Sequence, residues 1–145
     1  MSQCELCFPD NDRVLWKNDQ FYVLDASSDL FPAYIRIVTI KHVPEMTDLP
    51  QEERQELRDL MDVCESLMRD VLHPDKVNWA QFGNMVPHLH WHLTARWRDD
   101  AVFPDNPWGK PVREVSEDVQ QARKEAAELF LKRLPDALDQ FSRSR

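Results

Sequence analysis

The chain has 145 residues, 42% of them hydrophobic, and its 18 Lys and Arg against 26 Asp and Glu give a formal net charge of −8. A chain of this length is able to bury a sizeable core, and we expect one domain spanning residues 1–145. The negative charge argues against non-specific binding to nucleic acid or to an anionic membrane, since both require a basic surface.

The sequence shows no charged leader followed by an apolar run, and no stretch approaches the roughly eighteen apolar residues of a membrane span. We therefore expect a cytoplasmic protein that does not enter a membrane. Three cysteines, an odd number in a chain without a secretion signal, do not make a disulfide framework.

Near its start the chain carries a lone Cys-x-x-Cys pair, Cys4 and Cys7. One pair is a weak signal, because zinc usually takes four ligands and a redox pair needs a thioredoxin-like βαβ context that is absent here. From the residues alone, a metal site and a reduced pair on a flexible terminus both stay open.

Short strands are expected in the first third of the chain. Apolar residues from Val14 to Leu24 predict one or two of them around a polar turn at residues 17–20. Asp25 then ends the strand, where a carboxylate either caps the turn or contacts a ligand. The β-branched run from Tyr34 to Ile40 is typical of a central strand.

The next segment is predicted to be a helix. Residues 48–51 have a capping-box arrangement, with Asp48 able to accept from the first turn and Gln51 to reach back. Apolar residues then recur at the three- and four-residue spacing of an amphipathic face: Leu57, Leu60, Met61, Cys64, Leu67, Met68 and Val71. The pair His73-Pro74 ends the helix.

Another strand is predicted from Val77 to Phe82, after which Gly83 and Asn84 turn the chain. Gly83 is one of only two glycines, and a turn there is able to aim backbone amides at a phosphate. Asn78 and Asn84 carry side-chain amides that are able to satisfy the turn.

Three of the five histidines fall within the apolar segment at residues 87–94. An extended conformation places His88, His90 and His92 on one face and the intervening apolar residues on the other. A helix would instead turn His90 to the opposite side. We therefore predict a strand that starts at Pro87 and presents a row of imidazoles.

Imidazole ionises near neutral pH, so such a row supplies a nucleophile, a general base or a general acid. One metal ion cannot easily take all three, because a strand runs about 13 Å from His88 to His92, whereas zinc holds nitrogens at about 2.0–2.1 Å. Nucleophilic chemistry is therefore the better fit.

After the triad, residues 99–112 are rich in proline and predict a loop whose Phe103 and Trp108 close over the site or cover a subunit surface. Ser116 is placed to cap a final amphipathic helix, which Pro135 breaks or bends. Strand pairs and two long helices indicate an α+β fold class, an antiparallel sheet with helices packed on it.

The triad segment at residues 84–92, Asn-Met-Val-Pro-His-Leu-His-Trp-His, resembles the signature of the histidine-triad (HIT) superfamily, His-x-His-x-His followed by apolar residues. Residues 77–83 are similar to the strand and turn that precede it. Residues 36–49 are similar to the family's strand, its Lys/His-Val turn and its helix entry. The resemblance covers residues 21–98. The sequence around the triad looks most like that of bacterial family members described as diadenosine-tetraphosphate-hydrolase-like.

This resemblance implies an HIT-like fold, with two main helices on an antiparallel sheet. It also implies a single HIT domain with its core at about residues 14–98 and a C-terminal loop and helix at 99–142. Partners implied by it are a nucleotide substrate and a second copy of the chain in a homodimer.

The activity that the resemblance implies is hydrolysis or nucleotidyl transfer at the α-phosphate of a nucleoside phosphate, either a dinucleoside polyphosphate or an adenylyl phosphoramidate. In that reaction His90 attacks phosphorus and forms a nucleotidyl-histidine intermediate. His92 donates to a phosphate oxygen or assists the leaving group, and His88 supports the row. Catalysis needs no cofactor, although a polyphosphate substrate arrives carrying Mg²⁺.

By the same resemblance Asp25 contacts the ribose, while Asn78, Gly83 and Asn84 contact the substrate. Some HIT proteins hold a structural zinc ion with an N-terminal cysteine pair and two histidines. The residues here that match that set are Cys4, Cys7, His42 and His88.

Other positions near the triad match the family pattern only in part. Arg96 matches a family arginine, whereas Thr94 and Ala95 replace the usual apolar residue and proline, and Ala33 stands where many members have glycine. We expect these departures to change the outline of the nucleotide pocket more than the chemistry.

Two alternatives stay open. One is a non-catalytic nucleotide-binding or interaction module that keeps the triad for recognition. The other is a metal-dependent hydrolase that uses His88 and His90 as ligands. Sensitivity to a chelator and the activity of a His90 variant separate these classes.

Overall fold

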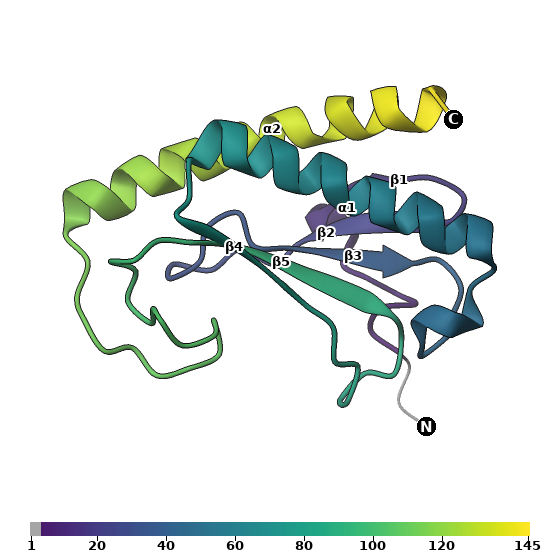
Figure 1. Cartoon of the computed structure of the whole chain (residues 1–145), viewed down its shortest axis with the longest axis horizontal. Helices are drawn as coiled ribbons and strands as arrows, with labels where there is room; N and C mark the ends of the chain where they lie inside the picture. Colours follow the sequence, from purple (N-terminus) through teal and green to yellow (C-terminus); the bar gives the residue numbers. More distant parts are fainter. Residues whose placement is uncertain (1–3) are drawn as a thin grey trace.

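Residues 4–145 are described by a computed structural model, in which an antiparallel sheet carries two helices on one face (Figure 1). In this part of the chain the strands are β1 (Val14–Lys17), β2 (Phe21–Asp25), β3 (Ile35–Thr39), β4 (Lys76–Ala80) and β5 (His90–Arg96), and the α-helices are α1 (Gln51–Leu72) and α2 (Glu117–Arg143). Short 3-10 helices precede β1 at Asn11–Arg13 and α1 at Met46–Asp48. The expected α+β class is therefore confirmed.

The strands lie in the order β1-β2-β3-β5-β4, so the last strand of the chain sits between β3 and β4. Of the one or two strands predicted before Asp25, two are present, β1 and β2, and the β-branched strand β3 is central, as its sequence indicates. Helices α1 and α2 lie side by side, whereas the segments that flank β5 extend away from them (Figure 1).

The segment at residues 87–89 is not part of the strand, although the sequence predicts a strand from Pro87. Regular pairing begins at His90, because the N–H groups of the two preceding residues bond elsewhere. The His88 N–H donates to Val86 O at 2.8 Å, and the Leu89 N–H donates to Val43 O at 2.7 Å. This tight turn gives His88 a different orientation from the two histidines inside β5.

Within β5 the side chains alternate as predicted. The residues at odd positions belong to the core between the sheet and the helices, and Leu93 is fully buried there. The residues at even positions lie on the other face of the sheet, where His90, His92 and Thr94 are all buried polar groups. A strand with polar groups buried on one face is unusual and marks that face for function.

The helix ends differ in detail from the sequence predictions. Asp48 does not cap α1 through its side chain; it forms a capping box with Glu45 across the preceding 3-10 turn, and Pro50 is the N-terminal cap of α1. The helix ends at His73, which adopts the left-handed conformation at φ 48°. Pro135 neither breaks nor ends α2, because buried Leu134 and Leu138 anchor the helix to the core on both sides of the proline.

A buried ion pair fixes the start of the loop that follows β5. The Asp100 carboxylate accepts hydrogen bonds from Arg96 Nε at 2.9 Å and Nη2 at 3.1 Å, and from the backbone N–H groups of Val102 and Phe103. Burial alone would raise the pKa of Asp100, but Arg96 and these N–H groups hold it below its ordinary value.

None of the helices between residues 4 and 145 is both long and apolar enough to cross a lipid bilayer.

Replacing Asp100 by Asn should lower the free energy of unfolding by about 3–5 kcal/mol, because Arg96 would be left buried without a countercharge. Urea unfolding at pH 7 measures this change. The matched control is Asp99→Asn, since the Asp99 side chain is 63% exposed in its ion pair with Arg123, and a loss of at most about 1 kcal/mol is expected there.

The lowered pKa of Asp100 means that its contribution is present above the ordinary carboxyl pKa of 3.8 and is lost as the pH falls further. The difference between the wild type and Asp100→Asn should therefore shrink in acid. Equal losses in the two variants at pH 7 would contradict a structural role for the buried pair.

Candidate functional site

Two histidines of β5 form the centre of the site, on the sheet face away from the helices. His90 lies opposite Val38 and His92 lies opposite Arg36 in the β3–β5 ladder. Their ring centroids are 4.8 Å apart, and each side chain keeps only a small exposed edge. The predicted pairing of these two imidazoles on one face is therefore present.

The tautomer of His90 follows from one hydrogen bond. Its Nδ1 lies 2.6 Å from the carbonyl oxygen of His88. Because a carbonyl oxygen can only accept, Nδ1 must carry the proton. Nε2 of the neutral ring is then left with a lone pair, which is the form required of a nucleophile.

His92 is held in the opposite tautomer by Tyr34. The Tyr34 hydroxyl lies 2.5 Å from His92 Nδ1. Burial raises the pKa of Tyr34, while the charge of Arg36 acts in the opposite direction. The phenol therefore keeps its proton, which lies within hydrogen-bond reach of His92 Nδ1. The single ring proton of the neutral His92 is then on Nε2, where it is free to be donated.

Both imidazoles are neutral at pH 7. Burial is the main cause that lowers the pKa of His92, to about 4, and the charges of His90 and Arg36 add to it. Burial also lowers the pKa of His90, while its bond to the His88 carbonyl opposes this effect. The site therefore combines an unprotonated nitrogen on His90 with an N–H donor on His92.

The charge of Arg36 acts on both rings, a role that its sequence position did not predict. Arg36 lies in the middle of β3, directly opposite His92, with its guanidinium carbon 5.9 Å from the centre of the Tyr34 ring. Its Nε atom is buried without a hydrogen-bond partner, and it forms no ion pair among residues 4–145. In the sequence, its role could have been suspected because it is a charged residue within a strand rich in Ile and Val.

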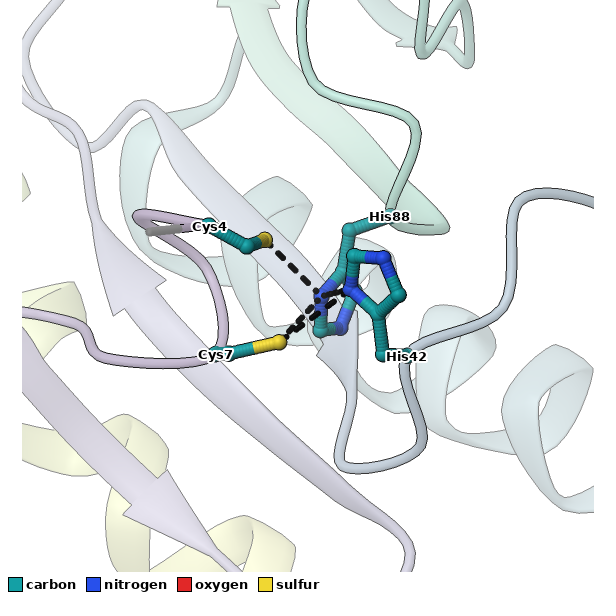
Figure 2. Close-up of side chains that lie close together, drawn as sticks. All are labelled: Cys4, Cys7, His42 and His88. Carbon is teal, nitrogen blue, oxygen red and sulfur yellow. Dashed lines mark hydrogen bonds between the residues drawn. The ribbon is translucent and has the colours of Figure 1, made fainter. Parts of the chain in front are cut away.

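The first triad histidine belongs to a separate cluster. His88 is fully buried, and its Nε2 donates to the backbone carbonyl of Thr39 at 2.7 Å. That bond leaves the Nδ1 lone pair facing the thiols of Cys4 and Cys7, at 3.5 Å from each sulfur (Figure 2). His42 completes the group, with Nδ1 3.1 Å from Cys7 Sγ and 3.2 Å from His88 Nδ1.

These four side chains come from three distant parts of the chain and point toward one another (Figure 2). One ligand atom from each lies within 4.8 Å of all the others. The structure thus brings together the complete set that the family resemblance indicates.

The candidate substrate residues are placed as follows. The Asp25 carboxylate accepts from the Ser27 N–H at 2.9 Å and so caps its turn. Asn78 Oδ1 accepts from Arg96 Nη1 at 2.9 Å. Gly83 adopts φ +72°, which a residue with a side chain adopts only with strain, and Asn84 is exposed beside it.

A cavity of about 290 Å³ adjoins His92 on the β4 side of the site. Its lining includes Asn78, Thr94 and Trp108. Trp108 belongs to the loop at residues 99–112, and its ring centroid lies 5.2 Å from that of His92. That loop therefore reaches over the site, one of its two expected positions.

The residues that depart from the family pattern have different surroundings. Thr94 lies on the same face of the sheet as the site and lines the cavity, whereas Ala95 is packed in the core between the sheet and the helices. Ala33 is fully buried and adopts φ 65°, the backbone conformation that glycine would adopt without strain.

Comparisons with known proteins agree with this geometry. A family model described as the HIT domain matches residues 9–99, well over half of the chain. A histidine triad protein from Marinobacter aquaeolei VT8 is 28% identical, with a TM-score of 0.65 over 85% of this chain and 92% of that one. A second, from Bradyrhizobium japonicum, is 24% identical, with a TM-score of 0.64 over 83% and 92% of the two chains.

A diadenosine triphosphate hydrolase from Plasmodium falciparum, solved with cyclomarin A, shares the fold at 21% identity, with a TM-score of 0.58 over 86% of this chain and 77% of that one. A search of curated proteins found no match. The likeness to solved structures confirms the expected arrangement of one antiparallel sheet and two main helices.

The two tautomers are directly testable by nitrogen-15 NMR at pH 7. We expect the ring proton of His90 on Nδ1 and that of His92 on Nε2, because of their bonds to the His88 carbonyl and the Tyr34 hydroxyl. His92 should gain a second proton only as the pH approaches about 4. Tyr34→Phe should leave His92 in a mixture of tautomers, and a His92 that titrates near 6.5 would contradict this description.

Proposed function

Because the chain belongs to the HIT family, we propose that it is a nucleotide hydrolase or nucleotidyl transferase acting at the α-phosphate of a nucleoside phosphate. The substrate would be a dinucleoside polyphosphate or an adenylyl phosphoramidate. The observation that carries the proposal is the lone pair on Nε2 of a neutral His90, held by the bond from Nδ1 to the His88 carbonyl. The hydrolase named among the structural neighbours is consistent with it.

The chemistry follows from the two tautomers. His90 Nε2 attacks the α-phosphorus, a bond from nitrogen to phosphorus forms, and the P–O or P–N bond to the leaving group breaks. The modified His90 ring carries a positive charge, which the His88 carbonyl stabilises through Nδ1–H. Water then cleaves the nitrogen–phosphorus bond and releases the nucleoside monophosphate.

His92 assists the leaving group through its Nε2–H. When the leaving atom takes this proton, His92 Nδ1 accepts the Tyr34 proton, and the phenolate is left beside the Arg36 guanidinium. In the second step the attacking water gives one proton to His92 Nε2 and its hydroxyl to phosphorus, and His92 Nδ1 returns the other proton to the Tyr34 oxygen. A 2.5 Å contact between Tyr34 and His92 is suited to such a transfer.

Arg36 supplies the local positive charge that a phosphate needs in a chain of net charge −8. Its guanidinium lies on the same face as both catalytic histidines and is not neutralised by a carboxylate within residues 4–145. Charge developing on the phosphoryl oxygens would be stabilised there. Asp25, Asn78, Gly83 and Asn84 keep their proposed roles around the ribose and phosphate.

The geometry favours this route over a metal-dependent hydrolase that uses His88 and His90. Both ring nitrogens of His88 are engaged, one by the Thr39 carbonyl and the other by the cysteine cluster. The Nδ1 atom of His90 is likewise taken by the His88 carbonyl. These two rings therefore do not converge on a common ion.

We also propose that Cys4, Cys7, His42 and His88 hold a structural zinc ion. Tetrahedral zinc with bonds of about 2.3 Å to sulfur and 2.0–2.1 Å to nitrogen separates two nitrogens by about 3.3 Å and a sulfur from a nitrogen by about 3.6 Å. Here the two nitrogens are 3.2 Å apart, three of the four sulfur–nitrogen pairs are 3.1–3.5 Å apart, and all four ligand atoms lie within 4.8 Å of one another. Thr39 O fixes the His88 tautomer, as an outer partner of a metal ligand does.

With four protein ligands the ion would have no open position, so its role would be structural. It would tie the N-terminal segment to the turn that carries the His88 carbonyl. Catalysis itself is proposed to need no cofactor, and Mg²⁺ would enter only with a polyphosphate substrate.

The metal content of purified protein tests the zinc proposal. We expect about one zinc ion per chain by mass spectrometry of the elements, and nearly none in Cys4→Ser or Cys7→Ser. Cys64→Ala is the matched control, because Cys64 is buried in the core away from the cluster and should leave the zinc content unchanged. Equal zinc content in all variants would reject the site.

Turnover of adenosine phosphoramidate and diadenosine tetraphosphate tests the activity. His90→Ala should lower kcat by about 10³-fold or more, since the nucleophile is removed, and His92→Ala by about 10²–10⁴-fold. The control His73→Asn replaces an exposed histidine in a left-handed position that asparagine tolerates. It should leave turnover unchanged.

Activity that survives in His90→Ala would contradict the covalent mechanism. Turnover abolished at once by a chelator would instead favour the metal-dependent hydrolase. Binding of nucleotide without turnover of any substrate would favour the non-catalytic module.

A further inference from the structure

The cysteine–histidine cluster contains two thiols that are placed to react with each other. Cys4 and Cys7 are the ends of one tight turn, in which the N–H groups of Cys7 and Phe8 donate to the Cys4 carbonyl at 3.2 and 3.3 Å. The ends of such a turn have Cα atoms less than about 7 Å apart, which agrees with the separation of about 4.4–6.8 Å that a disulfide usually bridges. Both sulfurs point toward His88 and lie within 4.8 Å of each other (Figure 2). A disulfide between them therefore needs only local rotation of the two side chains.

The three cysteines differ in their access to an oxidant. Cys7 is exposed, Cys4 is half-buried, and Cys64 is fully buried in the core, where burial raises the pKa of its thiol to about 12. Because the thiolate is the form that attacks an oxidant, Cys64 is inert. Cys4 and Cys7 lie outside the helices and so lack the helix N-terminus that activates the thiol of a thioredoxin-like enzyme. Reaction with a small oxidant, and not exchange with a protein disulfide, is the chemistry that this position favours.

The disulfide and the metal cluster exclude each other. Two sulfurs on a tetrahedral zinc ion lie about 3.8 Å apart, whereas two sulfurs in a disulfide lie about 2.05 Å apart. A disulfide sulfur also lacks the thiolate charge that a metal ion requires. Oxidation would leave His42 and His88 as the remaining members of the set, and two ligands are too few for a structural zinc site.

Loss of the cluster would reach His90 through His88. The His88 side chain is fully buried, and its Nδ1 contacts the sulfurs of Cys4 and Cys7 at 3.5 Å and His42 Nδ1 at 3.2 Å. A buried nitrogen without a partner is unfavourable, so the ring has to reorient when the sulfurs leave. The backbone carbonyl of the same residue holds the proton on His90 Nδ1 at 2.6 Å. Movement of His88 would therefore weaken the bond that determines the His90 tautomer.

We propose that Cys4 and Cys7 are a site of reversible oxidation, at which a peroxide or another two-electron oxidant of thiols forms a disulfide and thereby lowers the activity of His90. This inference rests on the proposed function and on the proposed zinc ion, and it adds a regulation to them.

The reaction has two steps. The sulfur of Cys7, the more exposed of the two, attacks a peroxide oxygen; an S–O bond forms, the O–O bond breaks, and the departing hydroxide takes a proton and leaves as water. The sulfur of Cys4 then attacks that of Cys7, the S–S bond forms, the S–O bond breaks, and a second water leaves. The two sulfurs together lose two electrons, which with two protons convert one peroxide to two water molecules. A thiol reductant reverses the change.

The first test needs no substrate. The protein as purified is treated at pH 7 with diamide, an azo compound that oxidises thiols and is itself reduced to a hydrazine. We expect the loss of two hydrogen atoms, located at Cys4 and Cys7 by peptide mapping, and the release of about one zinc ion per disulfide. The nitrogen-15 spectrum should show a mixture of His90 tautomers in a chain that keeps its folded amide spectrum, and dithiothreitol with zinc should reverse the change. Cys64→Ala is the control and should respond as the wild type does.

The second test measures kcat/KM for adenosine phosphoramidate before and after oxidation. Diamide should lower it about tenfold, the size of effect expected when an outer partner of a site is lost. Cys7→Ser should start near the value of the oxidised wild type and fall no further with diamide; a fall as large as that of the wild type would contradict the inference. Inactivation by hydrogen peroxide but not by diamide would point instead to Met85, whose side chain is 96% exposed, and would also contradict it.

The outcomes separate the inference from the proposed function. Failure of diamide to join Cys4 to Cys7 would overturn the oxidation site and leave the nucleotide hydrolase intact. A disulfide that leaves zinc bound, or that changes neither the His90 spectrum nor kcat/KM, would do the same. Absence of turnover before oxidation would contradict the proposed function, while the mass, zinc and NMR measurements would still decide whether oxidation of the pair acts on His90.

Discussion

A carbonyl oxygen accepts hydrogen bonds and never donates them, so the 2.6 Å contact between His88 O and His90 Nδ1 determines which nitrogen of His90 is free. The carbonyl is aimed by the turn before β5, where the N–H groups of His88 and Leu89 bond to Val86 and Val43 instead of continuing the strand. The irregular start of β5 is therefore part of the site. Had pairing begun at Pro87, His88 would have lain in the ladder and not in this turn.

The same turn connects two centres with different tasks. The backbone of His88 orients the His90 ring, while its side chain joins the cysteine cluster through Nδ1 and the Thr39 carbonyl through Nε2. A zinc ion there would make the turn that holds His90 more rigid, and it would take no part in the reaction itself. Burial keeps the imidazoles of His90 and His92 neutral, so the positive charge beside them comes from Arg36 and not from an imidazolium.

Much of this arrangement could be predicted from the sequence, because it depends on local periodicity. Alternation of histidine and apolar residues indicated a strand with one imidazole face, and β3 and α1 were recognisable from β-branched and amphipathic patterns. The zinc ligand set and the fold family came from resemblance to known proteins. The roles of Arg36 and Tyr34 were not predicted, because they arise only when β3 pairs with β5, and Tyr34 meets His92 across 58 residues of chain. The strand start was misplaced because the partner of Leu89, Val43, is equally remote in sequence.

The central claim is that Nε2 of His90 becomes covalently bonded to phosphorus. Intact-protein mass spectrometry after rapid acid-free quenching of a His92→Ala variant with an adenylyl substrate tests it most directly, since slow release should let the intermediate accumulate. We expect a mass increase of one adenylyl group, located on His90 by peptide mapping. No adduct in a variant that still turns over its substrate, or an adduct on a different residue, would contradict it.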